Sequence, residues 1–439
     1  EFFNIKHTVC QSFNKGASPK LAPIMLTPEL PLSLQVAILE RDIERWTVQA
    51  KQLAMTVMMK DEIAKNSVVV KAKQLQLTPQ SWQSDWSLAV ITNSHYVSDI
   101  RVPVQVKSTG HIDVNPTESS INTKLTVNDA TFTAQKFKYP DMSSEDINAS
   151  LLAPLVVNID KGEVLPFDFV LSTALLNNQY QHKYKIEKLT AQHRGRFSAE
   201  VLNVSSDWQL DDVALKSENT AELLNLNPNK IVGYLLFPEQ AIPSLITDKY
   251  PLPAGLSLPA RVTNRLDYQI MLNEPQRFLT ASMSGGLTAD SSTFNEVTAT
   301  DINTHWRCKI NADKPDLATS LKAKCNINSD VLSVDMGPVA TNLTFSGLVS
   351  FADEQLQVAV DNASAEVFSG TVSLSPLLIT DFDHIVGQLH VRNLSLPKIL
   401  ELYQVPGVKV TGLLKADLPF VAKGAAVSIT DGSIEQQGA

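Results

Sequence analysis

The feature that most constrains the fold of this chain is a two-residue alternation of apolar and polar side chains in its C-terminal quarter. The apolar set is Leu343, Phe345, Gly347, Val349 and Phe351. The polar set between them is Asn342, Thr344, Ser346 and Ser350, with Leu348 the one exception. After a turn at 352–354, the alternation continues with Leu356, Val358 and Val360. Since side chains of a strand point alternately to its two faces, the pattern predicts a hairpin with one apolar and one wet face.

Strand-like segments recur over most of the chain. They are residues 32–38, 87–92, 101–107, 121–127, 167–172, 183–189, 196–201 and 267–272. Spacings of roughly a dozen residues or more, with Asn, Asp, Gly and Pro between, are typical of an all-β meander. Residues 36–46 also fit a short helix, so both interpretations stay open for that segment. The sequence therefore predicts an all-β fold with few helices.

Two short helices are expected within this fold. The first covers residues 220–224 and continues toward residue 237, and the second covers 395–403. In the second, Ser395 can cap the helix and Pro397 lies in its first turn. The proline-rich stretch 250–255 is the best candidate for a joint. We expect one segment over residues 1–249, with a helical insertion near 220–237, and a second over 250–439.

Charge and composition exclude several classes of function. The 439 residues include 37 Lys and Arg against 46 Asp and Glu, a net charge of −9, and 44% are hydrophobic. Without a basic stripe, the chain lacks the clustered cations that nucleic acids or an anionic membrane surface attract. No signal peptide and no membrane-spanning run is visible. The chain starts at Glu1 and stops soon after a turn at 430–432, so we interpret it as an excised piece of a longer protein.

Two of the three cysteines are placed to form a disulfide. Cys308 and Cys325 lie in strand-like segments on either side of a turn-like stretch, residues 311–316. Adjacent antiparallel strands would bring the two cysteines face to face, although two buried free thiols remain the alternative. A disulfide here implies an oxidising compartment. Cys10 has no assignment.

The sequence offers little sign of catalysis. His384 and His390 are six residues apart, with Asp381 and Asp383 nearby, but a third metal ligand at a strong spacing is missing. A solvated strand face explains these residues better. No nucleophile elbow, phosphate loop, dinucleotide fingerprint or zinc-protease motif is present. We therefore predict that the chain is not an enzyme and needs no cofactor or metal.

An amphipathic sheet of this size has three ways to cover its apolar face. It can pack on a second sheet as a sandwich, close as a barrel, or curl and leave an apolar trough for a ligand. Composition alone favours packed sheets with a side-chain core.

The C-terminal end of the chain resembles the YdbH-like proteins, the "dicarboxylate transport" domain family of the AsmA-like, bridge-like lipid transport group. The resemblance is strongest over residues 363–438. The matching segments, in order, are Ala365–Gly370, Ile385–Val391, Asn393–Leu396 with the following helix, Val410–Pro419 and Val427–Ile434. Ala416 stands where the family usually has glycine. The resemblance implies an elongated, curled antiparallel β-sheet groove that moves phospholipid between the inner and outer membranes of a Gram-negative cell envelope.

The resemblance also implies a location and partners. The location is the periplasm, with an inner-membrane anchor outside this segment, and a small outer-membrane partner could add a strand at the C-terminal end. A dicarboxylate site would need convergent Arg and Lys side chains, and the sequence shows none. The expected groove lining is Leu343, Phe345, Val349, Phe351, Leu356, Val358, Val360, Leu389, Val391, Leu414 and Leu418. The alternative is a structural scaffold or adhesin-like module of the envelope, in which the same residues form a sandwich core.

Overall fold

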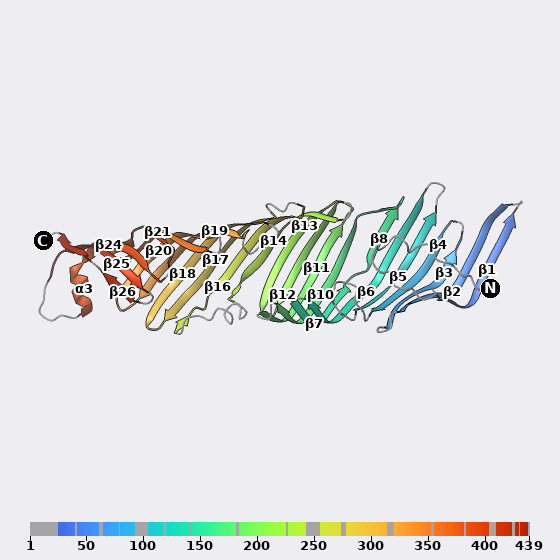
Figure 1. Cartoon of the computed structure of the whole chain (residues 1–439), viewed down its shortest axis with the longest axis horizontal. Helices are drawn as coiled ribbons and strands as arrows, with labels where there is room; N and C mark the ends of the chain where they lie inside the picture. Colours follow the sequence, from blue (N-terminus) through green and yellow to red (C-terminus); the bar gives the residue numbers. More distant parts are fainter. Residues whose placement is uncertain are drawn as a thin grey trace. The chain divides into compact units, whose positions relative to one another are not determined.

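The structure is a computed structural model of the 439-residue chain. It describes residues 25–39, 42–60, 65–78, 80–92, 104–116, 120–139, 142–180, 184–224, 227–242, 255–273, 278–313, 320–352, 355–381, 383–403, 410–423, 426–429 and 431–437. These residues form two compact units, Glu1–Asp211 and Asp212–Ala439. Each unit is a long antiparallel sheet in which most strands pair with their neighbours in sequence (Figure 1).

The described residues of the first unit form twelve strands. They are β1 (Met25–Leu39), β2 (Asp42–Lys60), β3 (Lys65–Leu77), β4 (Trp82–Thr92), β5 (Val104–Pro116), β6 (Ile121–Tyr139), β7 (Met142–Leu151), β8 (Leu155–Asp160), β9 (Glu163–Val164), β10 (Phe167–Tyr180), β11 (Tyr184–Phe197) and β12 (Val201–Leu210). Strands β1 to β7 pair in chain order, and β10 follows β7, before β11 and β12.

In the second unit, the described residues form the remaining strands and one helix. They are β13 (Val213–Leu224), β14 (Asn227–Ala241), β15 (Leu256–Ser257), β16 (Arg261–Met271), β17 (Leu279–Phe294), β18 (Val297–Ala312), β19 (Lys322–Asp335), β20 (Val339–Ala352), β21 (Gln355–Val367), β22 (Gly370–Leu374), β23 (Leu377–Ile379), β24 (Ile385–Ser395), α3 (Leu396–Tyr403), β25 (Leu413–Lys423), β26 (Ala426–Ile429) and β27 (Ser433–Gln437). The strands pair in the order β13, β14, β16, then β17 to β22 in sequence, and finally β24 and β25.

Some long strands are paired on one side by two short strands laid end to end. Strand β6 pairs with both β7 and β8, and β21 pairs with both β22 and β23. The break between the short strands falls at Pro154 in the first case and at Pro376 in the second. Proline has no backbone N–H to donate to the ladder, so it ends one short strand and lets the next begin.

Left-handed residues bend several strands. Within strands, positive φ angles occur at Gln74 (52°), Asn177 (50°), Asp301 (50°), Asn342 (53°) and Asn393 (57°). The ladder shifts register next to Gln74, Asn342 and Asn393. Such bulges bend a strand and increase its twist, and Asn and Asp tolerate the left-handed conformation better than most residues. They give the sheet its curl.

The predicted fold class, an all-β curled antiparallel sheet with a short helix near residue 400, is confirmed. The segment 32–38 is part of β1, so the helical alternative for 36–46 is wrong. The predicted strand 196–201 is wrong in its middle, because Ser198 and Val201 close a turn. The Ser198 amide donates to the Val201 carbonyl oxygen at 2.8 Å, and the Val201 amide donates to Ser198 Oγ at 3.0 Å.

The helical insertion predicted near 220–237 is also wrong. These residues belong to strands β13 and β14, which pair with each other from Lys216 and Leu236 to Leu224 and Asn227. Pairing within the sheet, reinforced by a 2.8 Å ion pair between Lys230 and Glu222, overrides the helix propensity of the Ala-Glu-Leu-Leu sequence. The predicted joint at 250–255 lies, apart from Gly255, outside the described residues, as does Cys10.

The described residues contain no sealed core of large side chains. The most buried apolar residues are chiefly alanines, such as Ala134, Ala281 and Ala340, and no large side chain is fully buried. In a sandwich, the apolar positions of both sheets would be closed off from water. Here they stay half-buried on one side of the sheet.

Candidate functional site

Strand β18 shows how the sheet sorts its side chains. Ile302, Thr304, Trp306, Cys308 and Ile310 are buried or half-buried. The residues between them, Asp301, Asn303, His305, Arg307 and Lys309, are exposed. Strand β19 alternates in the same way, with Lys322, Lys324 and Asp330 exposed. We call the side that carries Trp306 in unit 2, and Trp86 and Phe169 in unit 1, the inner face, and the opposite side the outer face.

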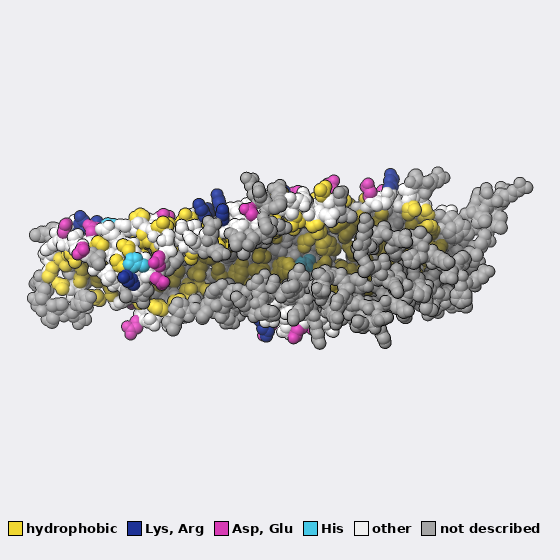
Figure 2. Space-filling model, viewed as in Figure 1, with side chains coloured by type: hydrophobic (Ala, Val, Ile, Leu, Met, Phe, Trp, Pro, Cys, Tyr) yellow, Lys and Arg dark blue, Asp and Glu magenta, His cyan; other side chains and the backbone are white. Residues whose placement is uncertain are grey.

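The inner face is continuous from strand to strand in unit 2. Directly opposed residues carry one apolar row across eight strands: Leu235, Leu266, Met283, Cys308, Cys325, Val349, Val358 and Ile379. Figure 2 shows hydrophobic side chains gathered in a hollow over β16 to β19, with charged side chains toward its rims. This row is the clearest candidate for a binding surface.

A comparable row crosses the first unit. It comprises Val90, Val106, Phe132, Ala149, Thr173, Ala191 and Trp208. The row crosses seven strands and contains one hydroxyl and no charged group. Each unit thus presents its own apolar inner face.

A cavity of about 390 Å³ lies on the inner face of unit 2. Its lining includes Val331, Leu343, Phe345, Val372, Leu374 and Leu389, contributed by β19, β20, β22 and β24. This volume falls within the range of about 300–1,000 Å³ typical of small-molecule pockets. The cavity is therefore large enough for part of an apolar ligand.

The predicted lining residues lie on this face. Leu343, Phe345 and Leu389 line the cavity. The others follow from the register: Phe351 opposes Leu356, Val349 opposes Val358, Val360 opposes Gly347, and Val391, Leu414 and Leu418 oppose Val372, Leu394 and Leu389. Exposure varies along the face, since Val360 is 6% exposed and Leu356 46%. The inner face is partly covered near the first and open near the second.

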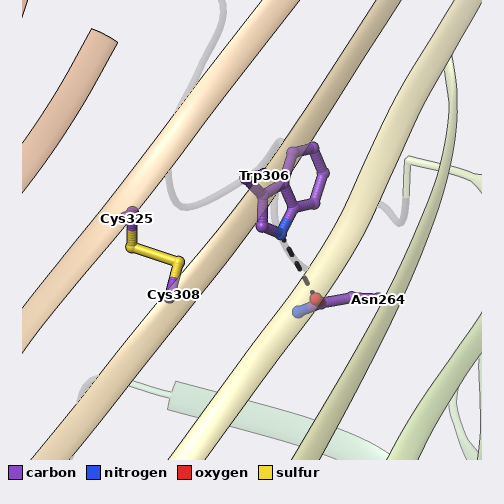
Figure 3. The surroundings of a disulfide bond; sticks show 4 residues. All are labelled: Asn264, Trp306, Cys308 and Cys325. Atoms are coloured by element: carbon purple, nitrogen blue, oxygen red, sulfur yellow. Dashed lines mark hydrogen bonds between the residues drawn. A yellow bond between two sulfur atoms is a disulfide. The ribbon is translucent and has the colours of Figure 1, made fainter.

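The disulfide lies on the inner face. Cys308 and Cys325 oppose each other on β18 and β19, their Cα atoms are 3.9 Å apart, and their sulfur atoms are bonded (Figure 3). The predicted pairing is present in the structure. The bond joins two strands at the centre of the apolar row and so fixes their register.

Sequence reasoning missed the polar side chains on the inner face. In unit 2 the Tyr268 hydroxyl donates to the Asn219 side-chain oxygen, and Trp306 Nε1 donates to Asn264 Oδ1 at 3.3 Å. In unit 1, His193 lies between the hydroxyls of Thr173 and Ser206 at 3.0 Å and 2.7 Å. In the sequence these polar residues only interrupt the apolar pattern. The register of the strands shows that their side chains form hydrogen bonds with one another.

His193 and His111, both in unit 1, have pKa shifts in opposite directions. Burial lowers the pKa of His193, on the inner face. The pKa of His111, on the outer face, is raised chiefly by its 2.8 Å hydrogen bond to Asp85, with a further bond to Asp113 at 3.2 Å. Protonation is therefore unfavourable at His193 and favourable at His111.

These shifts predict opposite effects of pH on stability. As pH falls below about 6.5, the ordinary histidine pKa, the unfolded chain protonates His193 before the folded chain does, so the free energy of unfolding decreases. For His111 the stabilisation is complete below about 6.5 and is lost as pH rises through the raised pKa. Urea unfolding from about pH 5 to 8 should show less acid destabilisation in His193→Gln. His111→Asn should lack the extra stability that wild type has at low pH, so its free energy of unfolding should fall less than that of wild type as pH rises. Unchanged profiles would contradict the assignment.

The histidines predicted to lie on a solvated face have different surroundings. His384 is exposed, whereas His390 bonds Ser375 Oγ at 2.7 Å and Asp417 Oδ1 at 2.5 Å. Arg392 also bonds Asp417 at 2.7 Å, and these two partners, His390 first, lower the pKa of that carboxyl. The network lies on the outer face, and Arg392 neutralises the carboxylate. Its hydrogen bonds link β24 to β25 and to Ser375.

Neither a metal centre nor a membrane-spanning helix is found among the described residues. No group of three or more His, Cys, Asp or Glu side chains in the described part of the chain is arranged to hold a metal ion. No helix formed by the described residues is long and apolar enough to cross a membrane.

Comparison with known proteins links the C-terminal part of the chain to one family. A search of curated proteins finds none that matches the chain. A family model matches residues 327–439, which include β20 to β27, α3 and all the residues that line the cavity. Its description is "YdbH-like: Intermembrane phospholipid transport protein YdbH". The resemblance predicted for the C-terminal end is confirmed, since residues 327–439 of this chain are similar to the YdbH-like family.

Proposed function

We propose that this chain is a periplasmic segment of an envelope-spanning protein, and that it conducts phospholipid between the inner and outer membranes along its inner face. The observation that carries the proposal is the apolar row from Leu235 to Ile379, which crosses eight strands of unit 2 without a charged residue. The name of the matching family, an intermembrane phospholipid transport protein, supports the same substrate.

The energetics of lipid transfer favour such a surface. Each methylene group kept from water is worth about 0.8 kcal/mol, so two acyl chains need on the order of 20 kcal/mol of shielding to leave a bilayer. An aliphatic wall supplies this shielding without directional contacts, so a lipid can move along it. Lys, Arg and Asp on the outer face of β18 and β19 keep the other side of the sheet in water.

Lipid content tests the proposal. The purified 439-residue chain is extracted with organic solvent, and we expect mass spectrometry to detect phospholipid. The delipidated chain, shown to be folded by circular dichroism, is then offered labelled phospholipid vesicles. A folded chain that carries no lipid and takes up none would favour the scaffold or adhesin-like alternative.

We also propose that a small outer-membrane partner adds a strand to the C-terminal edge of the sheet. Strand β27 pairs with β25, and all five of its residues are exposed. An uncovered edge strand offers unpaired N–H and C=O groups to a new strand. A photo-cross-linker at Glu435 should capture the partner in envelopes that contain the full protein, whereas one at outer-face Asp330 should not. Equal capture at both positions would count against an edge interaction.

A further inference from the structure

Aromatic side chains on the inner face stand opposite glycines of the neighbouring strand. The directly opposed pairs are Trp86 with Gly110, Phe169 with Gly195, Tyr268 with Gly233, Trp306 with Gly285, and Phe420 with Gly387. Two pairs are in unit 1 and three in unit 2. Because each pair is directly opposed, the ring and the missing side chain belong to the same face.

Four of the five rings, all but Tyr268, lie in the space that a side chain at the glycine would occupy. An ideal Cβ at Gly110 would be 2.7 Å from Trp86 Cζ2, and one at Gly285 would be 2.7 Å from Trp306 Cε2. A Cβ at Gly387 would be 2.6 Å from Phe420 Cζ. These distances are well inside van der Waals contact, so the rings of Trp86, Trp306 and Phe420 rest on the backbone of the adjacent strand.

Two of the rings are also fastened at their far end. Trp306 reaches across β17 and donates its Nε1 proton to Asn264 on β16, as Figure 3 shows. Tyr268 reaches across β14 and donates its hydroxyl proton to Asn219 on β13. Each ring therefore spans a glycine-bearing strand and is held on the second strand along.

This arrangement affects the space above the sheet. Side chains of strands ordinarily stand roughly perpendicular to the sheet, so upright rings would project into the space over the inner face. A ring lying over glycine covers the backbone with apolar surface and leaves that space open. We propose that Gly110, Gly195, Gly233, Gly285 and Gly387 are positioning residues that keep these rings flat and so keep the acyl-chain path clear, an inference that rests on the proposed function.

Gly387 is the best position for a test. The three atoms nearest to a Cβ there belong to side chains, two to Phe420 and the third being Leu377 Cδ2 at 3.1 Å. A Cβ at Gly285 would instead be 2.5 Å from the Thr263 carbonyl oxygen. Gly387→Ala should therefore lift the Phe420 ring without breaking the ladder. We expect phospholipid uptake to fall about fourfold for each methylene contact that the raised ring displaces.

A second substitution distinguishes an effect of the raised ring from an effect of the altered backbone. Gly387→Ala combined with Phe420→Ala should restore uptake, since no ring remains to be raised. The matched control is Gly286→Ala, an outer-face change whose Cβ would meet His305 Nδ1 at 3.0 Å, and it should leave uptake unchanged. Normal uptake by folded Gly387→Ala, or no restoration by the double variant, would overturn the inference.

A readout without lipid separates this inference from the proposed function. Phe420 is replaced by fluorophenylalanine, and fluorine NMR spectra of the lipid-free 439-residue chain are compared with and without Gly387→Ala. A changed resonance supports displacement of the ring, and an unchanged one overturns it. If wild type takes up no lipid, the proposed function fails, and the spectra still decide whether the glycine positions the ring.

Discussion

Phe345→Asp is expected to reduce phospholipid uptake about a hundredfold or more while the chain stays folded, because an unpaired carboxylate against acyl chains costs several kcal/mol. Phe345 lines the cavity on the inner face, and its side chain is half-buried, not sealed. In the lipid-free chain an aspartate there can keep its water. Uptake of labelled phospholipid measures the first effect, and circular dichroism with thermal unfolding measures the second.

The next residue along β20 provides a matched control. Ser346 points to the outer face, opposite Asn328 and Asn362. Ser346→Asp adds the same charge on the same strand and should leave uptake near that of wild type. Val358→Asp, on the inner face opposite Val349 and Ile379, should behave like Phe345→Asp. If both inner-face variants unfold while Ser346→Asp does not, the inner face is a packed core and the conduction proposal is wrong.

Loss of the disulfide is expected to have the second largest effect. Cys308 and Cys325 are separated by 17 residues, and closing a loop of about that length stabilises a protein by about 3 kcal/mol. Replacing both cysteines with serine should lower the free energy of urea unfolding by about this amount. Wild type in reductant should unfold at the same urea concentration as the double variant.

The third cysteine provides the control for this experiment. Cys10→Ser should unfold like wild type under oxidising conditions and lose the same stability in reductant. If reductant leaves the unfolding of wild type unchanged, then the bond is either absent or without effect on stability.

The sequence predicted the fold best where the two-residue period is uninterrupted. In β20 and β21, the apolar positions from Leu343 to Val360 occupy one face as expected. Where β21 has a bulge at Asp361, the inward parity changes, and Ala363 opposes Phe345. No local pattern announces such a change, because it depends on how two strands align.

The errors have a common physical cause. The segment near Glu222 has good helix formers, yet it pairs with β14, and its ion pair to Lys230 forms across the strands. Local propensity is worth tenths of a kcal/mol for each residue, less than a strand gains from pairing and packing on both sides. The aromatic–glycine pairs stayed hidden for a related reason. Trp306 and Gly285 are partners only once the register of β17 and β18 is known.

The hydrogen bonds among polar side chains of the inner face have a consequence for motion along it. Asn264 is engaged by Trp306, Asn219 by Tyr268, and His193 by two hydroxyls. A passing molecule would therefore meet few donors or acceptors that still seek a partner, and would gain little by stopping beside any of them. On the proposed function, the free-energy profile from strand to strand across each unit would lack deep wells. Travel would then resemble one-dimensional diffusion, with its rate set by entry and exit at the two ends.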